Sequence, residues 1–367
     1  MDFSYSEEQE AVRSLSADVF ESVAARLGRV EATEERIDRE LWRSLADTGL
    51  LGIALPEQLG GGVRGMAELS VLLEQQGRAV APIPLWPGAL AACAIGRFGT
   101  DDQCRRAASF AAGDTFLTVA LEEFGPYVDR DPDTTARRVG EGWVVRGAKA
   151  AVPAAHVAAS IVVSATTDTG PALFLVDPRG EGVRAELAES TTREICADLT
   201  FDDAPGDLLG PIGPSTVSWL RERVEVALAA VQSGVAAAAV EQSVAYLNER
   251  HQFGRPLATF QSVRHQLADC YIDLEAMRVT LWQAAQLLDE GADPGTAVLV
   301  AKWWATDAGR RVVHRTQHVH GGIGVDTEYP LHRYLLWGMQ IAATLGGSAA
   351  DLERIGALLA GDEEVFV

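Results

Sequence analysis

The spacing of apolar residues changes twice along the chain. Up to about residue 115, apolar positions lie three and four residues apart, which predicts amphipathic helices. Breaks in that pattern fall at Pro56, Gly60–Gly62 and Pro82–Pro87. From residue 116 to about 205, short β-rich runs bounded by Gly, Asp and Pro predict a small antiparallel barrel or sandwich. These runs are Trp143–Val145, Ile161–Val163, Ala172–Val176 and Asp198–Phe201.

The last region begins with a linker and continues as long helices. Asp202–Ser215 is rich in Pro and Gly, and we expect it to connect the β region to the helices that follow. Four long helical patterns predict a helix bundle. They span Val217–Arg250, Val263–Glu290, Pro294–His318 and Pro330–Leu359. The sequence therefore predicts a mainly α chain with a β middle domain: a helical domain over 1–115, a β-barrel over 116–205 and a four-helix bundle over 206–367.

Composition and charge narrow the class of protein. A chain of 367 residues that is 47% hydrophobic can bury a large core, and we expect it to be fully globular. Its 31 basic and 52 acidic side chains give a net charge of −21, which disfavours nucleic acid and anionic membranes as partners. The N-terminus is acidic and no uncharged apolar run reaches about 18 residues, so we expect no membrane span, no signal peptide and a cytoplasmic location.

Cysteine and lysine usage adds two further points. The four cysteines have no metal-ligand spacing, which predicts reduced, mostly buried thiols and no metal site. They are Cys93, Cys104, Cys196 and Cys270. The only lysines are Lys149 and Lys302, so arginine supplies nearly all of the positive charge.

Two segments carry residues suited to a dinucleotide, Tyr246–Asp269 and Thr316–Arg333. The planar guanidinium of Arg250 suits a pyrophosphate, and Phe253 offers a flat apolar face. Taken singly, Arg250 could complement a helix end and Phe253 could be ordinary core. The amide of Gln261 both donates and accepts, and a pair of glycines, Gly321 and Gly322, lets backbone approach a ligand closely. In this order across two segments, we favour a binding site.

These segments resemble the acyl-CoA dehydrogenase family. In that family an Arg-x-x-Phe-Gly pattern, an aromatic-or-His-Gln pair and a Gly-Gly turn grip the ADP half of FAD. The matching residues are Arg250, Phe253, Gly254, Gln261, Gly321 and Gly322, and His318 falls where the family has a glutamine. An imidazole can still donate a hydrogen bond, so His318 is kept as a cofactor contact, whereas His320 and His332 are interpreted as structural. The N-terminal stretches 1–11, 41–62 and 74–84 are similar to the family's fold signature.

The parts that hold the flavin ring in the family are altered here. Its Thr-Glu-Pro-Gly-x-Gly-Ser-Asp loop aligns with Glu122–Asp129, where Glu122, Tyr127 and Val128 replace Thr, Gly and Ser. Its Trp-Ile-Thr strand aligns within Gly147–His156, where Trp becomes Ala151 and Thr becomes Pro153. A proline has no backbone donor, an alanine removes the shielding ring, and a glutamate adds a carboxylate beside an electron-rich heterocycle. The resemblance therefore predicts that this chain's own flavin pocket no longer binds the flavin ring.

The catalytic base is also missing from its family position. A glutamate just before a Gly-Thr or Gly-Ser turn removes the α-proton in the family, and the matching residue here is Leu345. Some members place the base on the first helix of the bundle, and that position is Val224. Glu225 lies one residue away, about 100° around the helix, and Glu222 lies two away. We interpret both glutamates as surface residues rather than bases.

The residues that match the family's ADP-binding pattern, called the clasp below, are retained, whereas the base is lost. This combination implies a subunit that completes a partner's active site. The chain resembles the base-lacking subunit of the heteromeric acyl-CoA dehydrogenases of actinobacteria, two-plus-two tetramers whose relatives act on steroid-CoA thioesters. The resemblance implies FAD shared with a paired subunit that carries the catalytic Glu and most of the acyl-CoA site, with electron-transfer flavoprotein or a similar acceptor. One alternative is a self-sufficient homomeric flavoenzyme that uses Glu225 or Glu222 as a displaced base. Another is a non-enzymatic scaffold or acyl-CoA-binding protein.

Overall fold

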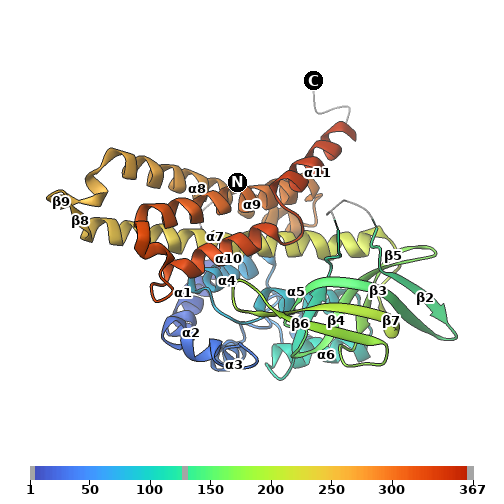
Figure 1. The fold of residues 1–367 in the computed structure, drawn as a ribbon. Helices are drawn as coiled ribbons and strands as arrows, with labels where there is room; N and C mark the ends of the chain where they lie inside the picture. The colour runs from blue at the N-terminus through green and yellow to red at the C-terminus, as the bar shows by residue number, and fades with distance from the viewer. Residues whose placement is uncertain (1–4, 126–130, 362–367) are drawn as a thin grey trace. The chain divides into compact units, whose positions relative to one another are not determined.

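The computed structural model describes residues 5–125 and 131–361 (Figure 1). The chain divides into two compact units. One unit comprises Ser14–Leu69 and Pro82–Val224. The other gathers the residues up to Arg13, the segment Ser70–Ala81 and the chain from Glu225 onward. The boundaries cut through three helices, so we describe each unit by itself, and the division into three domains stays a prediction.

Helices fill the N-terminal region, as the apolar spacing predicts. They are α1 Glu7–Phe20, α2 Val23–Glu31, α3 Arg39–Asp47, the 3-10 turn η1 Glu57–Leu59, α4 Met66–Ala79, α5 Leu85–Phe98 and α6 Asp101–Ala111. Local sequence sets several of these ends. Asp38 caps α3 by accepting the backbone N–H of Leu41, and Thr100 and Gln103 form a capping box at α6. Gly60 ends η1 in the left-handed conformation, with φ 77°.

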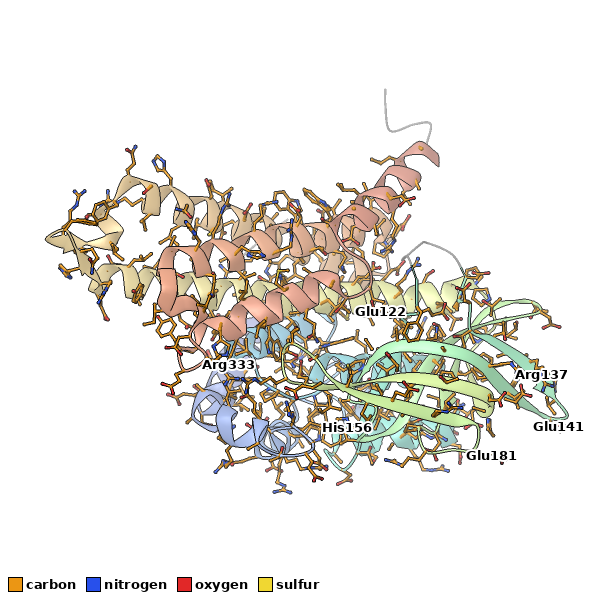
Figure 2. The ribbon with its side chains drawn as sticks, viewed as in Figure 1. Glu122, Arg137, Glu141, His156, Glu181 and Arg333 are labelled. Atoms are coloured by element: carbon orange, nitrogen blue, oxygen red, sulfur yellow. The ribbon has the colours of Figure 1, made fainter. Side chains whose placement is uncertain are left out.

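The β region closes into a barrel. Its strands are β1 Phe116–Ala120, β2 Thr135–Val139, β3 Gly142–Pro153, β4 Ala158–Thr167, β5 Gly170–Val176, β6 Val183–Glu189 and β7 Ile195–Leu209. Pairing runs β4–β2–β3–β7–β5 and back to β4, while β1 adds to β4 and β6 adds to β7. Figure 2 shows Arg137 and Glu141 at the free end of the β2–β3 hairpin. The prediction of a barrel holds, but β1–β4 and β2–β4 are parallel pairs, so the expected antiparallel arrangement is wrong for these two.

The predicted linker is mostly strand. Residues 202–209 belong to β7, where Ala204 pairs with Val145 of β3 and Leu208 pairs with Phe174 of β5. Pairing on both sides satisfies the backbone of this Pro- and Gly-rich stretch, which is why it does not behave as a linker. Only residues 210–213 connect β7 to the next helix.

Long helices make up most of the second unit. They are α7 Pro214–Glu249, which enters the unit at Glu225, α8 Gln261–Glu290, α9 Gly295–His320, α10 Leu331–Ala343 and α11 Ser348–Gly361. Short elements join them: strands β8 His251–Gln252 and β9 Arg255–Pro256, and 3-10 turns η2 Leu257–Thr259 and η3 Gly321–Val325. The pattern over Pro330–Leu359 is two helices rather than one, because the chain turns sharply at Leu345, where φ is 55°. Helix α7 is apolar and long enough to cross a membrane, but 94% of its apolar window is buried, as in a core helix.

The orientation of α9 along α8 places its last turn beside the first turns of α8. Asp273 of α8 pairs with Arg311 at 2.8 Å and with Arg315 at 3.2 Å, and Arg315 also reaches Asp269 at 3.5 Å. The later arginine of α9 therefore meets the earlier aspartate of α8, which fixes the two helices as antiparallel. Behind this seam, Cys270, Leu274 and other apolar side chains pack against α9.

Candidate functional site

The chain passes from α7 to α8 through a tight hairpin that exposes Arg250 and Phe253. The backbone N–H of Leu257 donates to the carbonyl of Arg250 at 2.8 Å, which closes the loop. Phe253 and Gly254 both adopt the left-handed conformation, with φ 54° and 79°. Phe253 is 90% exposed, and its ring forms a T-shaped pair with that of Phe260, with ring centroids 6.1 Å apart. Figure 1 shows the β8–β9 hairpin beyond the ends of α7 and α8.

A ring stack brings the two predicted segments together. The ring of Tyr246 on α7 lies on that of His320 on α9, with centroids 4.5 Å apart and an interplanar angle of 18°. Tyr246 is one helical turn before Arg250, and its carbonyl accepts the Arg250 N–H at 2.8 Å. Gly321 follows His320 directly, so the arginine and the glycine pair share one end of the bundle. Sequence reasoning missed Tyr246. The signal available was its position four residues before Arg250, because residues four apart lie on the same face of a helix.

The polar side chains predicted to bind the cofactor all face solvent. Arg250, Gln261 and His318 are exposed, and none makes a side-chain hydrogen bond or ion pair with any residue in 5–125 or 131–361. Gly321 and Gly322 have open space where a side chain would stand. An exposed guanidinium with unused donors, beside an amide, an imidazole and bare backbone, suits the phosphates of a dinucleotide. The donor set therefore fits the ADP half of FAD.

Apolar residues are exposed on the same unit. Tyr271, Ile272 and Val279 of α8 are 58%, 65% and 40% exposed, and Val325 in η3 is 68% exposed. Isolated exposed apolar residues are common, but a stripe along one helix together with Phe253 is typical of a surface that a partner covers.

Leu345, where the resemblance predicts the catalytic base to be missing, carries no proton acceptor in its side chain. Leu345 is 3% exposed and stands in the left-handed conformation between α10 and α11. Gly346 follows it with φ 89°. The turn between α10 and α11 therefore presents a buried alkyl side chain.

Glu225 is buried rather than on the surface, which corrects its interpretation as a solvated residue. It is 1% exposed, and its Oε1 accepts a hydrogen bond from Nη1 of Arg354 at 2.6 Å. Nearby, Lys302 lies 3.6 Å from Asp351 and donates to Thr306 at 3.0 Å. Burial raises the pKa of Asp351 above its usual value, against the lowering effect of the Lys302 charge. These side chains hold α7, α9 and α11 together through charge inside the unit.

A buried ion pair includes Glu123, from the loop that the resemblance aligns with the family's flavin-binding loop. Lys149 of β3 is fully buried and donates to Oε1 of Glu123 at 2.8 Å and to Ser164 at 3.0 Å. Glu123 also accepts the backbone N–H groups of Asp133 at 2.7 Å and Thr134 at 2.8 Å. Burial lowers the pKa of Lys149 to about 8, although Glu123 acts in the opposite direction. Sequence reasoning recorded Lys149 only as one of two lysines and did not expect it inside.

The altered positions around that pair are partly described. Tyr127 and Val128 lie outside the described residues, whereas the carbonyl of Glu122, labelled in Figure 2, accepts the N–H of Ala150 at 2.9 Å. Ala151 has φ 49° at an irregularity in the β3–β7 pairing. The carbonyl of Pro153 accepts a hydrogen bond from Thr118 at 2.6 Å. These backbone groups are engaged within the barrel.

The cysteines are free thiols but are less buried than predicted. Cys270 is buried, whereas Cys93, Cys104 and Cys196 are partly exposed. The prediction fails at Cys196 because it lies opposite the edge strand β6, which has little covering it. In the described part of the chain, no group of three or more His, Cys, Asp or Glu side chains could hold a metal ion.

Comparison with known proteins extends to the whole chain. Residues 6–113 match the family model for the acyl-CoA dehydrogenase N-terminal domain, and residues 220–357 match that for the C-terminal domain. The chain is 36% identical to acyl-CoA dehydrogenase FadE27 of Mycobacterium tuberculosis over 374 residues, covering 98% of this chain and 99% of FadE27.

Two solved structures are similar throughout. One is a variant of the Tcur3481–Tcur3483 steroid ACAD, with a TM-score of 0.94 and 52% identity over 97% of this chain and 98% of that one. The other is the ChsE4–ChsE5 complex from Mycobacterium tuberculosis, with a TM-score of 0.93 and 35% identity over 99% of this chain and 100% of that one.

Proposed function

Because the chain belongs to the acyl-CoA dehydrogenase family, whose members are FAD-binding oxidoreductases, we propose that it is the base-lacking subunit of a heteromeric enzyme. In this proposal it completes the FAD site of a paired subunit that carries the catalytic glutamate. The similarity to one steroid ACAD and to one two-component complex supports both the pairing and a steroid-CoA thioester as substrate.

The observation that carries the proposal is the contrast between two positions. The clasp residues Arg250, Gln261 and His318 are exposed and make no side-chain hydrogen bond or ion pair within 5–125 and 131–361, whereas the base position is occupied by buried Leu345. A chain that keeps an outward-facing cofactor half-site and lacks the proton acceptor has the parts needed to assist another subunit's site. Glu225 does not support a self-sufficient enzyme, because it is buried and hydrogen-bonded to Arg354.

Each clasp residue has a separate task in this proposal. Arg250 would donate two parallel hydrogen bonds to pyrophosphate oxygens, and Gln261 and His318 would add single hydrogen bonds. Phe253 would cover an apolar face of the cofactor, and Gly321 would let the backbone approach it. Bound FAD supplies the two-electron acceptor for α,β-desaturation of the thioester, and electron-transfer flavoprotein or a similar acceptor reoxidises it.

The apolar stripe on α8 supports an assembly of more than one chain. Tyr271 and Ile272 lie in the half of α8 that begins at Gln261, and Val279 lies about two turns further along the same helix. Covering them would remove apolar area from water and would hold the exposed clasp against a partner. We propose that the paired subunit covers this stripe.

Flavin content tests the proposal. The chain is purified alone and after co-expression with its paired dehydrogenase subunit, and FAD is measured by visible absorbance per polypeptide. We expect a colourless single chain and about one FAD per pair. Full flavin in the lone chain would revive a homomeric enzyme, and no flavin in either sample would favour a scaffold.

A pair of arginine variants makes the test specific to the clasp. Arg250→Ala in the complex should lose most of its FAD, because the pyrophosphate loses a charged donor. Arg310→Ala is the matched control, since Arg310 is an arginine of α9 whose side chain is 49% exposed. Equal flavin content in both variants contradicts the assignment of the clasp.

A further inference from the structure

The last turn of α9 holds two polar side chains with buried atoms that lack a hydrogen-bond partner among the described residues. Both amide atoms of Gln317 are buried, and neither has a hydrogen-bond partner among the described residues. The same is true of Nε2 of His320, a side chain that is only 4% exposed. Such atoms normally find partners, so two neighbouring exceptions call for an explanation.

The hydrogen-bonding capacity of each group is fixed by its surroundings. Nδ1 of His320 lies 2.8 Å from the carbonyl of Thr316 and must be the donor, which leaves a lone pair on Nε2. Tyr246 of α7 and Tyr329 before α10 face the ring, and burial lowers its pKa, so the ring is neutral. Nε2 of His320 can therefore only accept a hydrogen bond, whereas the amide of Gln317 can donate and accept.

The short turn η3 separates the Gln317 and His320 side chains from solvent. The backbone of the turn η3 lies on Gln317, because a Cβ built at Gly324 would stand 3.1 Å from the amide nitrogen of Gln317. On its outer side the turn is open, with Ile323 41% and Val325 68% exposed. Gly321 starts the turn at φ 64° and ψ −144°, a conformation reserved for glycine. A short turn with three glycines and an exposed outer side is the kind of segment that opens locally at little cost.

We propose that Gln317 and His320 are further contacts for the cofactor, reached when the η3 turn lifts. This inference rests on the proposed function. Phosphate oxygens carry no proton at neutral pH, so they cannot donate to Nε2 of His320. Its partner must bring a hydroxyl or amino hydrogen, which a ribose hydroxyl of the ADP half provides. The amide of Gln317, which lies under the same turn, can donate to a phosphate oxygen or accept from a ribose hydroxyl.

The test combines cofactor affinity with the stability of the free chain. Gln317→Leu removes a buried amide without a partner, so the melting temperature of the flavin-free chain should rise by a few degrees. In the complex, the same change should weaken FAD binding about tenfold, measured by the fluorescence of FAD titrated into deflavinated complex. Gln283→Leu, on the exposed face of α8, is the control and should change neither quantity.

A second variant and the arginine variant separate the outcomes. His320→Phe keeps the ring stack, removes the acceptor and should also weaken FAD binding. Unchanged FAD affinity in both Gln317→Leu and His320→Phe overturns the inference, whatever happens to the melting temperature. If Arg250→Ala in the same titration still lowers affinity, only this inference has failed. If Arg250→Ala also has no effect, the proposed function has failed with it.

Discussion

Breaking the Arg354–Glu225 pair should destabilise the protein more than a typical substitution. The side chains are 6% and 1% exposed and are joined at 2.6 Å, so Arg354→Met leaves a carboxylate inside the protein without its guanidinium. Removing one partner of such a pair costs about 3–5 kcal/mol, a large share of the roughly 5–15 kcal/mol that stabilises a typical domain. The free energy of unfolding of the bundle should fall by that amount in a denaturant titration followed by tryptophan fluorescence.

A double-mutant cycle isolates the pair. Glu225→Gln combined with Arg354→Met removes both charges, so the double variant should be more stable than Arg354→Met alone. The coupling energy should reach about 1–3 kcal/mol, as for other residues in direct contact. Strict additivity, or a loss below about 1 kcal/mol for Arg354→Met, would refute the reasoning. In the two-subunit complex that we propose, Glu225→Gln should leave the rate of desaturation unchanged, because the carboxylate stabilises the fold.

Three further changes have effects that follow from local geometry. Gly234→Ala should lower the free energy of unfolding in a denaturant titration by at least about 2 kcal/mol, because the new Cβ would stand 2.0 Å from the backbone oxygen of Glu74. The control Gly28→Ala should not destabilise the protein, because nothing lies within 4 Å of the new Cβ. Burial acts to raise the pKa of Glu123, but the Lys149 partner holds this pKa below 4.5. The charged carboxylate therefore stabilises the fold, and this stabilisation is lost as the pH falls through the pKa of the folded state. Glu123→Gln should therefore flatten the acid limb of a melting-temperature profile, and an unchanged limb would contradict this. Thr100→Ala should lower the free energy of unfolding by about 1 kcal/mol, because the capping box is lost. Coinciding thermal melts of the variant and the unchanged protein would contradict this.

Periodicity predicted the helices well because burial of one face is a local signal. The long patterns ending near Glu290 and His318 appear as α8 and α9 within a few residues. The chain direction of paired strands is not a local signal, so the parallel pairs of β4 could not be foreseen. The stretch containing Pro205 and Gly206 looked like a linker by composition, but it forms β7 because strands on both sides supply hydrogen-bond partners. Tertiary pairing overrode local propensity there.

The structure bears on the exposure of the predicted site residues, whereas their role in binding a cofactor stays a prediction. Arg250 and Phe253 are exposed on the hairpin, as a clasp for another chain requires. Burial was not predictable for charged residues, because sequence does not reveal a partner 129 positions away, as Arg354 is from Glu225. Gln317 was missed for a related reason, since its interest lies in the absence of a hydrogen bond within the described residues and not in a motif.

The placement of the two lysines determines whether reagents that modify lysine side chains can react with the folded chain. Lys149 and Lys302 are the chain's only lysines, and their side chains are 0% and 1% exposed in ion pairs. Acylating reagents, lysine-directed cross-linkers and lysine-modifying enzymes therefore find neither ε-amine on the native surface. Acylation of either side chain becomes a direct reporter of unfolding: Lys149 signals opening of the barrel, and Lys302 signals opening of the helix bundle.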